Sequence, residues 1–178
     1  VLVLTLAILP SAKAGSLHIM QAESPGPAPG KLVPKVGQTA KILYAIYIAM
    51  TLVQVILLII AGLPVYDAFI HAFGTAGTGG FSNMNRSVGE YNNVAVEIII
   101  TVFMFIFGVN FSLYYQGLKG NFKAFWRDEE FRFYTGTVVI AIALIVINTL
   151  GTVYQGFWDS LRYASFQVSS IITTTGYS

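Results

Sequence analysis

The chain has 178 residues and a formal net charge of +2, and only 10% of its residues are charged while 55% are hydrophobic. Soluble domains average about 25% charged residues, so this composition excludes an ordinary soluble globule. Cysteine is absent and the two histidines, His18 and His71, lie far apart, which excludes disulfides and thiolate sites and argues against a metalloenzyme.

The hydrophobic residues gather in long uncharged stretches. No charged residue occurs from Ile42 to Tyr66, or from Phe133 to Trp158. Each stretch exceeds the roughly 20 apolar residues that cross a bilayer core as a helix. We therefore expect an all-α membrane protein.

The first 41 residues lead up to the first complete span. Residues 1–10 are expected to be the end of a membrane helix that Pro10 terminates. A secretory signal peptide is the alternative, because Ala12-Lys13-Ala14 resembles a cleavage site. Residues 11–41 form a polar connector whose prolines oppose helix formation and favour an extended segment. These prolines are Pro25, Pro27, Pro29 and Pro34.

The rest of the chain alternates spans with short apolar segments. Full spans are expected at about residues 42–63, 94–115 and 133–153. Two shorter segments, 65–73 and 157–170, cannot cross a membrane. Residues 74–82 carry four glycines within seven positions and are not expected to be regular helix. A polar loop at 83–93 and a charged connector at 119–132 complete the chain.

Charge asymmetry orients the spans. Both the 11–41 connector and the 119–132 connector carry four lysines or arginines, whereas residues 64–93 have only Arg86. Positive residues accumulate on the cytoplasmic side of membrane proteins. The two connectors are therefore expected in the cytoplasm and the glycine-rich segment outside.

Two parts of the chain share one organisation, in which a span and a short segment precede a Thr/Gly-rich turn. The turns read Thr78-Gly79-Gly80-Phe81-Ser82 and Thr174-Thr175-Gly176-Tyr177-Ser178, and their glycines Gly80 and Gly176 stand 96 residues apart. Non-helical backbone at membrane depth is tolerated only where it is buried in protein or lines a wet cavity. Rings of backbone carbonyls can replace the hydration shell of a potassium ion. The repeat therefore predicts two loops of a selectivity filter, with oxygen ligands from Thr78, Gly79, Thr174 and Thr175.

These two turns resemble the second and third filter loops of the Trk/Ktr/HKT superfamily of potassium uptake proteins, and most of all those of its bacterial TrkH family. The stretches Met20-Gln21-Ala22-Glu23-Ser24-Pro25-Gly26-Pro27 and Gly108-Val109-Asn110-Phe111 look like that family as well. The resemblance implies helix–pore-loop–helix repeats that are potassium-channel-like, arranged pseudo-fourfold around one pore in a longer parent protein. It also implies that the filter includes Thr78, Gly79, Gly80 and Phe81 together with Thr174, Thr175, Gly176 and Tyr177.

The resemblance divides the chain into parts of three repeats. Residues 1–10 would end the inner helix of repeat one, and 11–41 would be a cytoplasmic Pro-rich connector. Residues 42–117 would form a complete repeat two, followed by a cytoplasmic connector at 118–132. Residues 133–178 would supply the outer helix, pore helix and filter of a truncated repeat three. Such a section could not conduct alone.

The family likeness also carries expectations about partners. It implies a homodimer in the cell inner membrane and a cytosolic, nucleotide-binding regulatory subunit of the Trk type, which would dock on a surface that includes the basic connector. No cofactor is expected, and potassium is the transported ion. Sodium or non-selective cation transport is the alternative, because some superfamily members have serine in place of a filter glycine. A non-transporting membrane scaffold and a membrane-embedded enzyme are less well supported: a scaffold needs no carbonyl-lined turns, and the spans hold only one carboxylate, Glu97.

Single polar residues near the loops have plainer interpretations. Glu97 lies near the outer end of its span, where its side chain could snorkel to the interface. Asn110 could line a vestibule or form an interhelical hydrogen bond. His71, with Gln167 at the matching place in the second unit of the repeat, is expected to form a structural hydrogen bond. Asp67 and Asp159 are expected to favour helix N-termini electrostatically.

The expected topology can be tested with two introduced cysteines, because the chain has none of its own. Cysteines placed singly at Asn85 and at Asn121 should react with a membrane-impermeant thiol reagent from opposite sides, Asn85 from outside. Labelling of both positions from the same side would contradict the number of spans.

Overall fold

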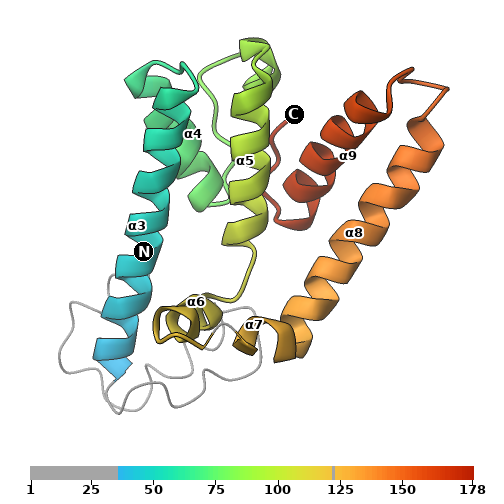
Figure 1. The fold of residues 1–178 in the computed structure, drawn as a ribbon. Helices are drawn as coiled ribbons and strands as arrows, with labels where there is room; N and C mark the ends of the chain where they lie inside the picture. The colour runs from blue at the N-terminus through green and yellow to red at the C-terminus, as the bar shows by residue number, and fades with distance from the viewer. Residues whose placement is uncertain (1–35, 122) are drawn as a thin grey trace. The chain divides into compact units, whose positions relative to one another are not determined.

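The computed structural model describes residues 36–121 and 123–178, so the expectations for residues 1–35, including the Met20–Pro27 likeness, lie outside the described part. The described residues form α-helices and one 3-10 helix, and no strand occurs among them. In chain order, the elements of Figure 1 are α3 (Val36–Ile60), α4 (Val65–Ala76), η1 (Ser87–Tyr91), α5 (Val94–Phe107), α6 (Phe111–Leu118), α7 (Lys123–Arg127), α8 (Glu129–Thr149) and α9 (Phe157–Ile172).

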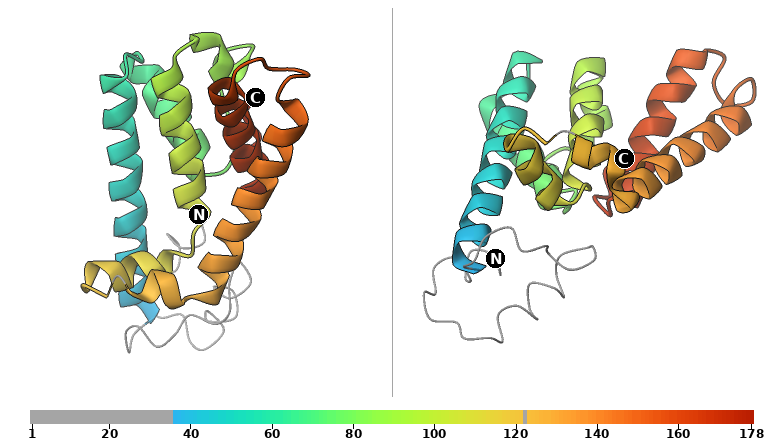
Figure 2. Two further views of the ribbon diagram at one scale, coloured as in Figure 1. Left: turned by 45° about the vertical axis from the view of Figure 1, so that its right-hand side comes forward. Right: turned by 60° about the horizontal axis from the view of Figure 1, so that its bottom comes forward.

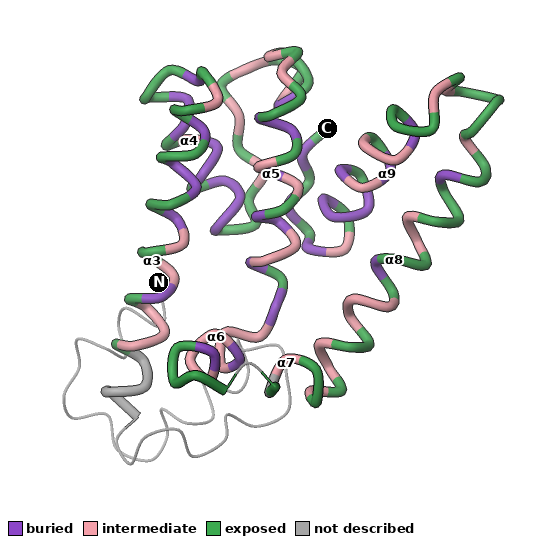
Figure 3. Tube along the Cα trace, in the orientation of Figure 1, coloured by how far each residue is buried: buried purple, intermediate pink, exposed green. Residues whose placement is uncertain are grey.

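Two of these helices are long and apolar enough to cross a membrane. They are Lys41–Ile60 within α3, with a mean hydropathy of 2.5, and α8, with a mean hydropathy of 1.8. Figure 3 shows most of α8 exposed, and its only fully buried residues are Val138 and Val146. An exposed apolar helix surface of this kind suits contact with lipid. The all-α membrane architecture expected from the sequence agrees with these helices.

The chain divides into two units. Among the described residues, one comprises 36–49 and Asn110–Arg132, and the other comprises Met50–Val109 and Phe133–Ser178. In the first unit α6 packs against α7, and aromatic rings of Tyr114, Phe125 and Phe131 contact one another in series.

In the second unit α5 lies between α4 and α9, as the views of Figures 1 and 2 agree. Its buried residues Ile100 and Met104 belong to one hydrophobic core with Leu58 of α3, Phe166 of α9 and Tyr177 beyond α9. The core therefore links the two short helices, α4 and α9, through α5 and brings the segments that follow them together.

The span expected at residues 94–115 is wrong as a continuous helix. Helix α5 ends at Phe107 with Gly108 as its C-cap, and α6 begins after Asn110. A Cβ at Gly108 would collide with the Tyr134 hydroxyl and lie 3.0 Å from Thr173 Cγ2, so glycine is needed at this close approach. Asn110 then caps α6, because its side chain accepts a hydrogen bond from Ser112 N at 3.0 Å. Its amide also donates to Glu130 Oε2 at 3.2 Å, which favours the hydrogen-bonding interpretation over the vestibule.

Other boundaries differ by a few residues. Helix α4 continues through Gly74, Thr75 and Ala76, which glycine propensity did not predict. The Thr75 hydroxyl donates to the His71 carbonyl at 2.7 Å, and Gly74 is packed so closely against the Tyr177 hydroxyl that a Cβ would not fit. Tertiary packing therefore overrides the low helix propensity of glycine at this end.

Candidate ion-binding site

The two predicted loops have the same backbone conformation at the same offsets. Thr78 and Thr174 have φ angles of 47° and 58°, and Gly80 and Gly176 have φ angles of 60° and 81°. The preceding helices end at equivalent residues, Ala76 of α4 and Ile172 of α9. The internal repeat inferred from the sequence therefore extends to individual dihedral angles.

Backbone hydrogen bonds repeat in the same way. In each loop the threonine amide donates to the carbonyl three residues earlier, and the second of the positive-φ residues donates to the carbonyl six residues earlier. The pairs are Thr78 N to Thr75 O and Thr174 N to Ile171 O, both 3.1 Å, and Gly80 N to Gly74 O and Gly176 N to Ser170 O, both 3.2 Å. The last turn of each short helix thus fixes the start of its loop.

Threonine at positive φ is unusual, because its branched side chain crowds the backbone there. Such residues cost on the order of 1–3 kcal/mol each and cluster at ligand clamps and active sites. Glycine would fit Thr78 and Thr174 without this cost. Ser87 and Asn92 also have positive φ, but Thr78 and Thr174 are the β-branched residues among the four and occupy equivalent places in the two loops.

The loops approach each other at Gly80. A Cβ on Gly80 would collide with the Thr175 carbonyl oxygen and lie 3.2 Å from the Gly176 carbonyl carbon. Only glycine can occupy this position without moving the neighbouring loop. The Thr175–Gly176 backbone of the second loop is consequently held close to Gly80 of the first.

Tyr177 locks the second loop onto the helix of the first. It is 2% exposed, and its hydroxyl lies 3.0 Å from the His71 carbonyl and 3.3 Å from the Phe81 carbonyl, to which it can donate. Its ring stacks on the His71 ring with centroids 5.8 Å apart, and its own carbonyl accepts from the Ser170 hydroxyl at 2.7 Å. The side chain of one loop therefore stabilises the backbone of the other.

His71 is fully buried and has partners at both ring nitrogens. Nδ1 lies 2.8 Å from the Asp67 carbonyl, which can only accept, so Nδ1 carries the proton. In the neutral ring Nε2 then accepts from the Ser82 hydroxyl at 3.2 Å. These contacts give His71 the structural hydrogen bonds expected from the sequence. Gln167, which occupies the matching position in α9, is exposed in the described part of the chain.

Asp67 fastens the polar loop at residues 83–93 to α4. Its carboxylate accepts from Asn83 Nδ2 at 2.6 Å and from the Tyr91 hydroxyl at 2.9 Å. Burial and the hydrogen bond to Asp67 raise the pKa of Tyr91, so this phenol keeps its proton at neutral pH. Asp67 therefore does more than favour the start of α4.

The eight predicted filter residues all lie in this region but differ in exposure. Thr175 and Tyr177 are buried, while Phe81, at the place that corresponds to Tyr177, is 73% exposed. The Thr173 hydroxyl donates to Ser169 O at 2.6 Å, so the Thr175 hydroxyl donates to Thr173 Oγ1 at 2.8 Å. This contact uses the proton of the Thr175 hydroxyl and holds its side chain against Thr173, while the Thr175 carbonyl oxygen lies beside Gly80.

One polar contact near the loops was missed by sequence reasoning. Glu97 does not snorkel to solvent but pairs with Arg162 of α9, 65 residues further along the chain, with Glu97 Oε2 3.3 Å from Arg162 Nε. The sequence does offer one indication of this pairing, because Glu97 and Arg162 are opposite charges in a part of the chain with few charged residues. No group of three or more His, Cys, Asp or Glu residues that could hold a metal occurs in the part that the structure describes.

The whole chain, residues 1–178, matches the family model described as "TrkH: Cation transport protein". The chain belongs to the TrkH family. It is 38% identical to the Trk system potassium uptake protein TrkH of Salmonella typhimurium and 37% identical to TrkH of Escherichia coli K12, in each case over 99% of this chain and 37% of the relative. It is also 32% identical to the potassium uptake protein TrkG of Escherichia coli K12.

A solved member of the family has the same fold. The crystal structure of the potassium transporter TrkH from Vibrio parahaemolyticus matches with a TM-score of 0.79 at 30% identity, over 99% of this chain and 36% of that one. This chain therefore spans little more than a third of the length of the TrkH proteins it matches. The family is one of transporters and not of enzymes.

The lock between the loops can be tested with Tyr177→Phe in a full-length protein that contains this chain. The substitution keeps the ring stack but removes the hydroxyl, leaving the His71 carbonyl of α4 and the Phe81 carbonyl of the first loop with fewer partners. We expect a loss of about 1–3 kcal/mol in stability and faster amide hydrogen exchange in residues 78–82. Tyr163→Phe is the control, since Tyr163 contributes a ring contact with Tyr154 that phenylalanine retains. Equal exchange in both variants would contradict the lock.

Proposed function

We propose that this chain forms part of a pathway for potassium ions across the cell inner membrane, and that its two loops contribute to a selectivity filter. The observation that carries the proposal is the pair of loops with matching backbone angles, held together where Gly80 meets the Thr175 carbonyl. An ion that leaves its hydration shell needs several fixed oxygens, and two matching loops supply them from one constrained backbone.

The helices that precede the loops add a favourable potential for cations. Helices α4 and α9 both end directly before a loop, so their C-terminal ends face it. A helix C-terminus carries a partial negative charge from its unpaired carbonyls. In transporters with discontinuous helices, such ends coordinate or attract cations.

Potassium is favoured over sodium by two considerations. The relatives are named potassium uptake proteins, and both loops have glycine at the position where serine accompanies sodium transport in some superfamily members. Thr78, Gly79, Thr174 and Thr175 supply the oxygen ligands in this proposal. A hydrogen bond holds the Thr175 side chain against Thr173, and we take the backbone carbonyl as the Thr175 ligand.

The proposal includes the partners implied by the family. The complete protein would form a homodimer in the inner membrane and bind a cytosolic, nucleotide-binding regulatory subunit of the Trk type. The basic connector offers a surface for such a subunit, with Lys119, Lys123 and Arg127 near or within the short helices α6 and α7.

The filter is tested with Gly176→Ser and Gly80→Ser in a full-length protein, by measuring the ratio of potassium to sodium uptake. Both glycines have positive φ, which costs a residue with a Cβ about 1–2 kcal/mol. We expect the loop to shift to relieve this strain in Gly176→Ser, and a loss of about 1.4 kcal/mol in its preference for potassium would lower the ratio about tenfold. Gly80→Ser should be more severe, because its Cβ also collides with the Thr175 carbonyl, whereas Gly176 has open space around it.

The control must be a glycine without such strain. Gly62, which lies outside the loops, does not meet this condition because its φ is +99°. Gly136 of α8 does, since its φ is not positive and there is open space where the Cβ of a serine would stand. Gly136→Ser should leave the ratio unchanged. If both loop variants also leave it unchanged while reaching the membrane, these loops are not the filter.

The connector is tested by neutralising Lys119, Lys123 and Arg127 together. We expect weaker regulation of uptake by the cytosolic subunit and an unaltered potassium to sodium ratio, because the three charges lie outside the unit that contains the loops. Transport with and without the subunit, measured in vesicles, checks this. Unchanged regulation would remove this surface from consideration, and a changed ratio would show that the connector has another role.

A further inference from the structure

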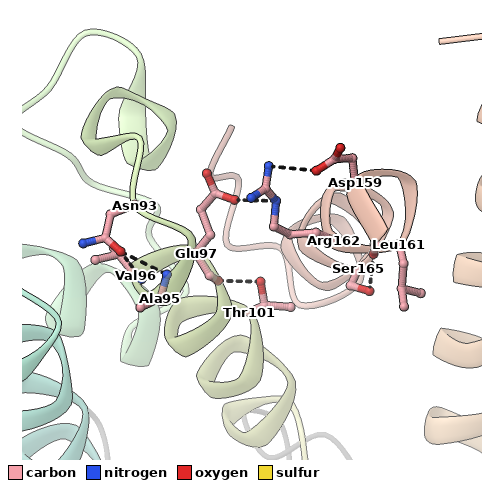
Figure 4. A network of polar contacts seen from close by, with 9 residues as sticks. All are labelled: Asn93, Ala95, Val96, Glu97, Thr101, Asp159, Leu161, Arg162 and Ser165. Carbon is pink, nitrogen blue, oxygen red and sulfur yellow. Dashed lines mark hydrogen bonds and ion pairs between the residues drawn. The ribbon is translucent and has the colours of Figure 1, made fainter. Parts of the chain in front are cut away.

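Arg162 lies between two carboxylates from different helices, as Figure 4 shows. Its Nε is 3.3 Å from Glu97 Oε2 of α5, and its Nη2 is 3.6 Å from Asp159 Oδ1 on its own helix, α9. The side chains of Glu97 and Arg162 are 12% and 21% exposed, whereas that of Asp159 is 60% exposed. We call the contact between Glu97 and Arg162 the outer ion pair.

The outer ion pair is sensitive to the alignment of its helices. Neither Glu97 Oε2 nor Arg162 Nε has a hydrogen-bond partner of good geometry among the described residues. The attraction between the two charges must therefore offset most of their loss of hydration. Removing Arg162 would leave the Glu97 carboxylate largely buried without an opposite charge, which is strongly unfavourable. Removing Glu97 would leave Arg162 with the exposed Asp159 of its own helix alone. Sliding α9 along α5 would have the same effect.

A stripe of α9 connects this pair to the second loop. Arg162, Phe166 and Ser170 follow at intervals of four residues and so lie on one face of the helix. Phe166 is buried in the core that contains Val96 and Ile100 of α5. Ser170, at the other end of the stripe, donates to the Tyr177 carbonyl at 2.7 Å. The ion pair and the loop are thus fixed at opposite ends of one helix.

We propose that the outer ion pair is a positioning device, which sets the register of α9 along α5 and thereby the place of the loop at residues 174–178 and its ion selectivity. Binding sites need their groups held within about 0.5 Å, and a slip of α9 by one residue moves the loop by about 1.5 Å. The inference rests on the proposed function of the loops as a filter. Glu97 and Arg162 are positioning residues in it and need not touch the ion.

A different mechanism would also make Glu97 matter, namely attraction of cations to the outer end by negative charge. Asp159 separates the two mechanisms. It carries the same charge beside the same arginine, but it is largely exposed and belongs to α9 itself, so it does not join α9 to α5. Asp159→Asn should lower the uptake of potassium and of sodium alike if charge attraction is the mechanism, whereas it should leave both uptake and selectivity unchanged if positioning is.

The experiment compares E97Q, R162Q, the double variant E97Q/R162Q and the control D159N in a full-length protein, at matched abundance in the membrane. We expect each single variant to lower the potassium to sodium ratio about fivefold to tenfold, and the double variant to lose less than the product of the two single losses. D159N should keep the wild-type ratio. A role confined to folding would change abundance and leave the ratio intact.

The inference is overturned if the potassium to sodium ratio is unchanged in both single variants, or if their losses of this ratio simply multiply in the double variant. It is also overturned if D159N loses as much uptake as E97Q. If a single variant does not reach the membrane, the charge-reversed variant E97R/R162E decides the matter, since it should restore both abundance and ratio. Failure of the reversed variant to restore a ratio would count against positioning.

If the loop glycine variants lower the ratio while E97Q and R162Q do not, only this inference fails. If the glycine variants have no effect, the proposed function fails as well.

Discussion

The meeting of two backbone segments at Gly80 constrains the rest of the second unit. No side chain fits between Gly80 and the Thr175 carbonyl, so the two loops can approach only if both keep their positive-φ residues in place. That requirement extends to the helices, because each loop is tied to the last turn of its helix by hydrogen bonds. The C-terminal ends of α4 and α9 must therefore lie close to each other, and both helices are positioned by packing against α5.

Hydroxyl groups satisfy much of the irregular backbone around the loops. Thr75 donates to His71 O, Thr173 to Ser169 O and Ser170 to Tyr177 O, all within buried surroundings. Water cannot supply these partners in a membrane interior, where each unpaired polar group costs several kcal/mol. Serine and threonine near the ends of α4 and α9 therefore have a structural role here.

Sequence reasoning located the elements whose signals are local. The starts of α4 and α9 follow Pro64 and Gly156, and the repeated Thr-Gly turns identified both loops from the sequence alone. It failed where the local structure depends on contacts with residues far along the chain. The break after Phe107 depends on the approach of Tyr134 to Gly108, and the helical state of Gly74 depends on Tyr177. The pairing of Glu97 with Arg162 likewise cannot be inferred from the sequence around either residue.

The hydrogen bond from Tyr177 to His71 joins residues 106 positions apart. Chains are synthesised at about 5–20 residues per second, so α4 and its loop emerge several seconds before the tyrosine that completes their packing. During that interval Gly74 and Gly80 lack the contacts that explain their conformations, and closing so long a loop is entropically costly. The first loop, residues 78–82, is therefore expected to become ordered late and together with the second. Although it is synthesised first, it depends on the later insertion and folding of α8 and α9.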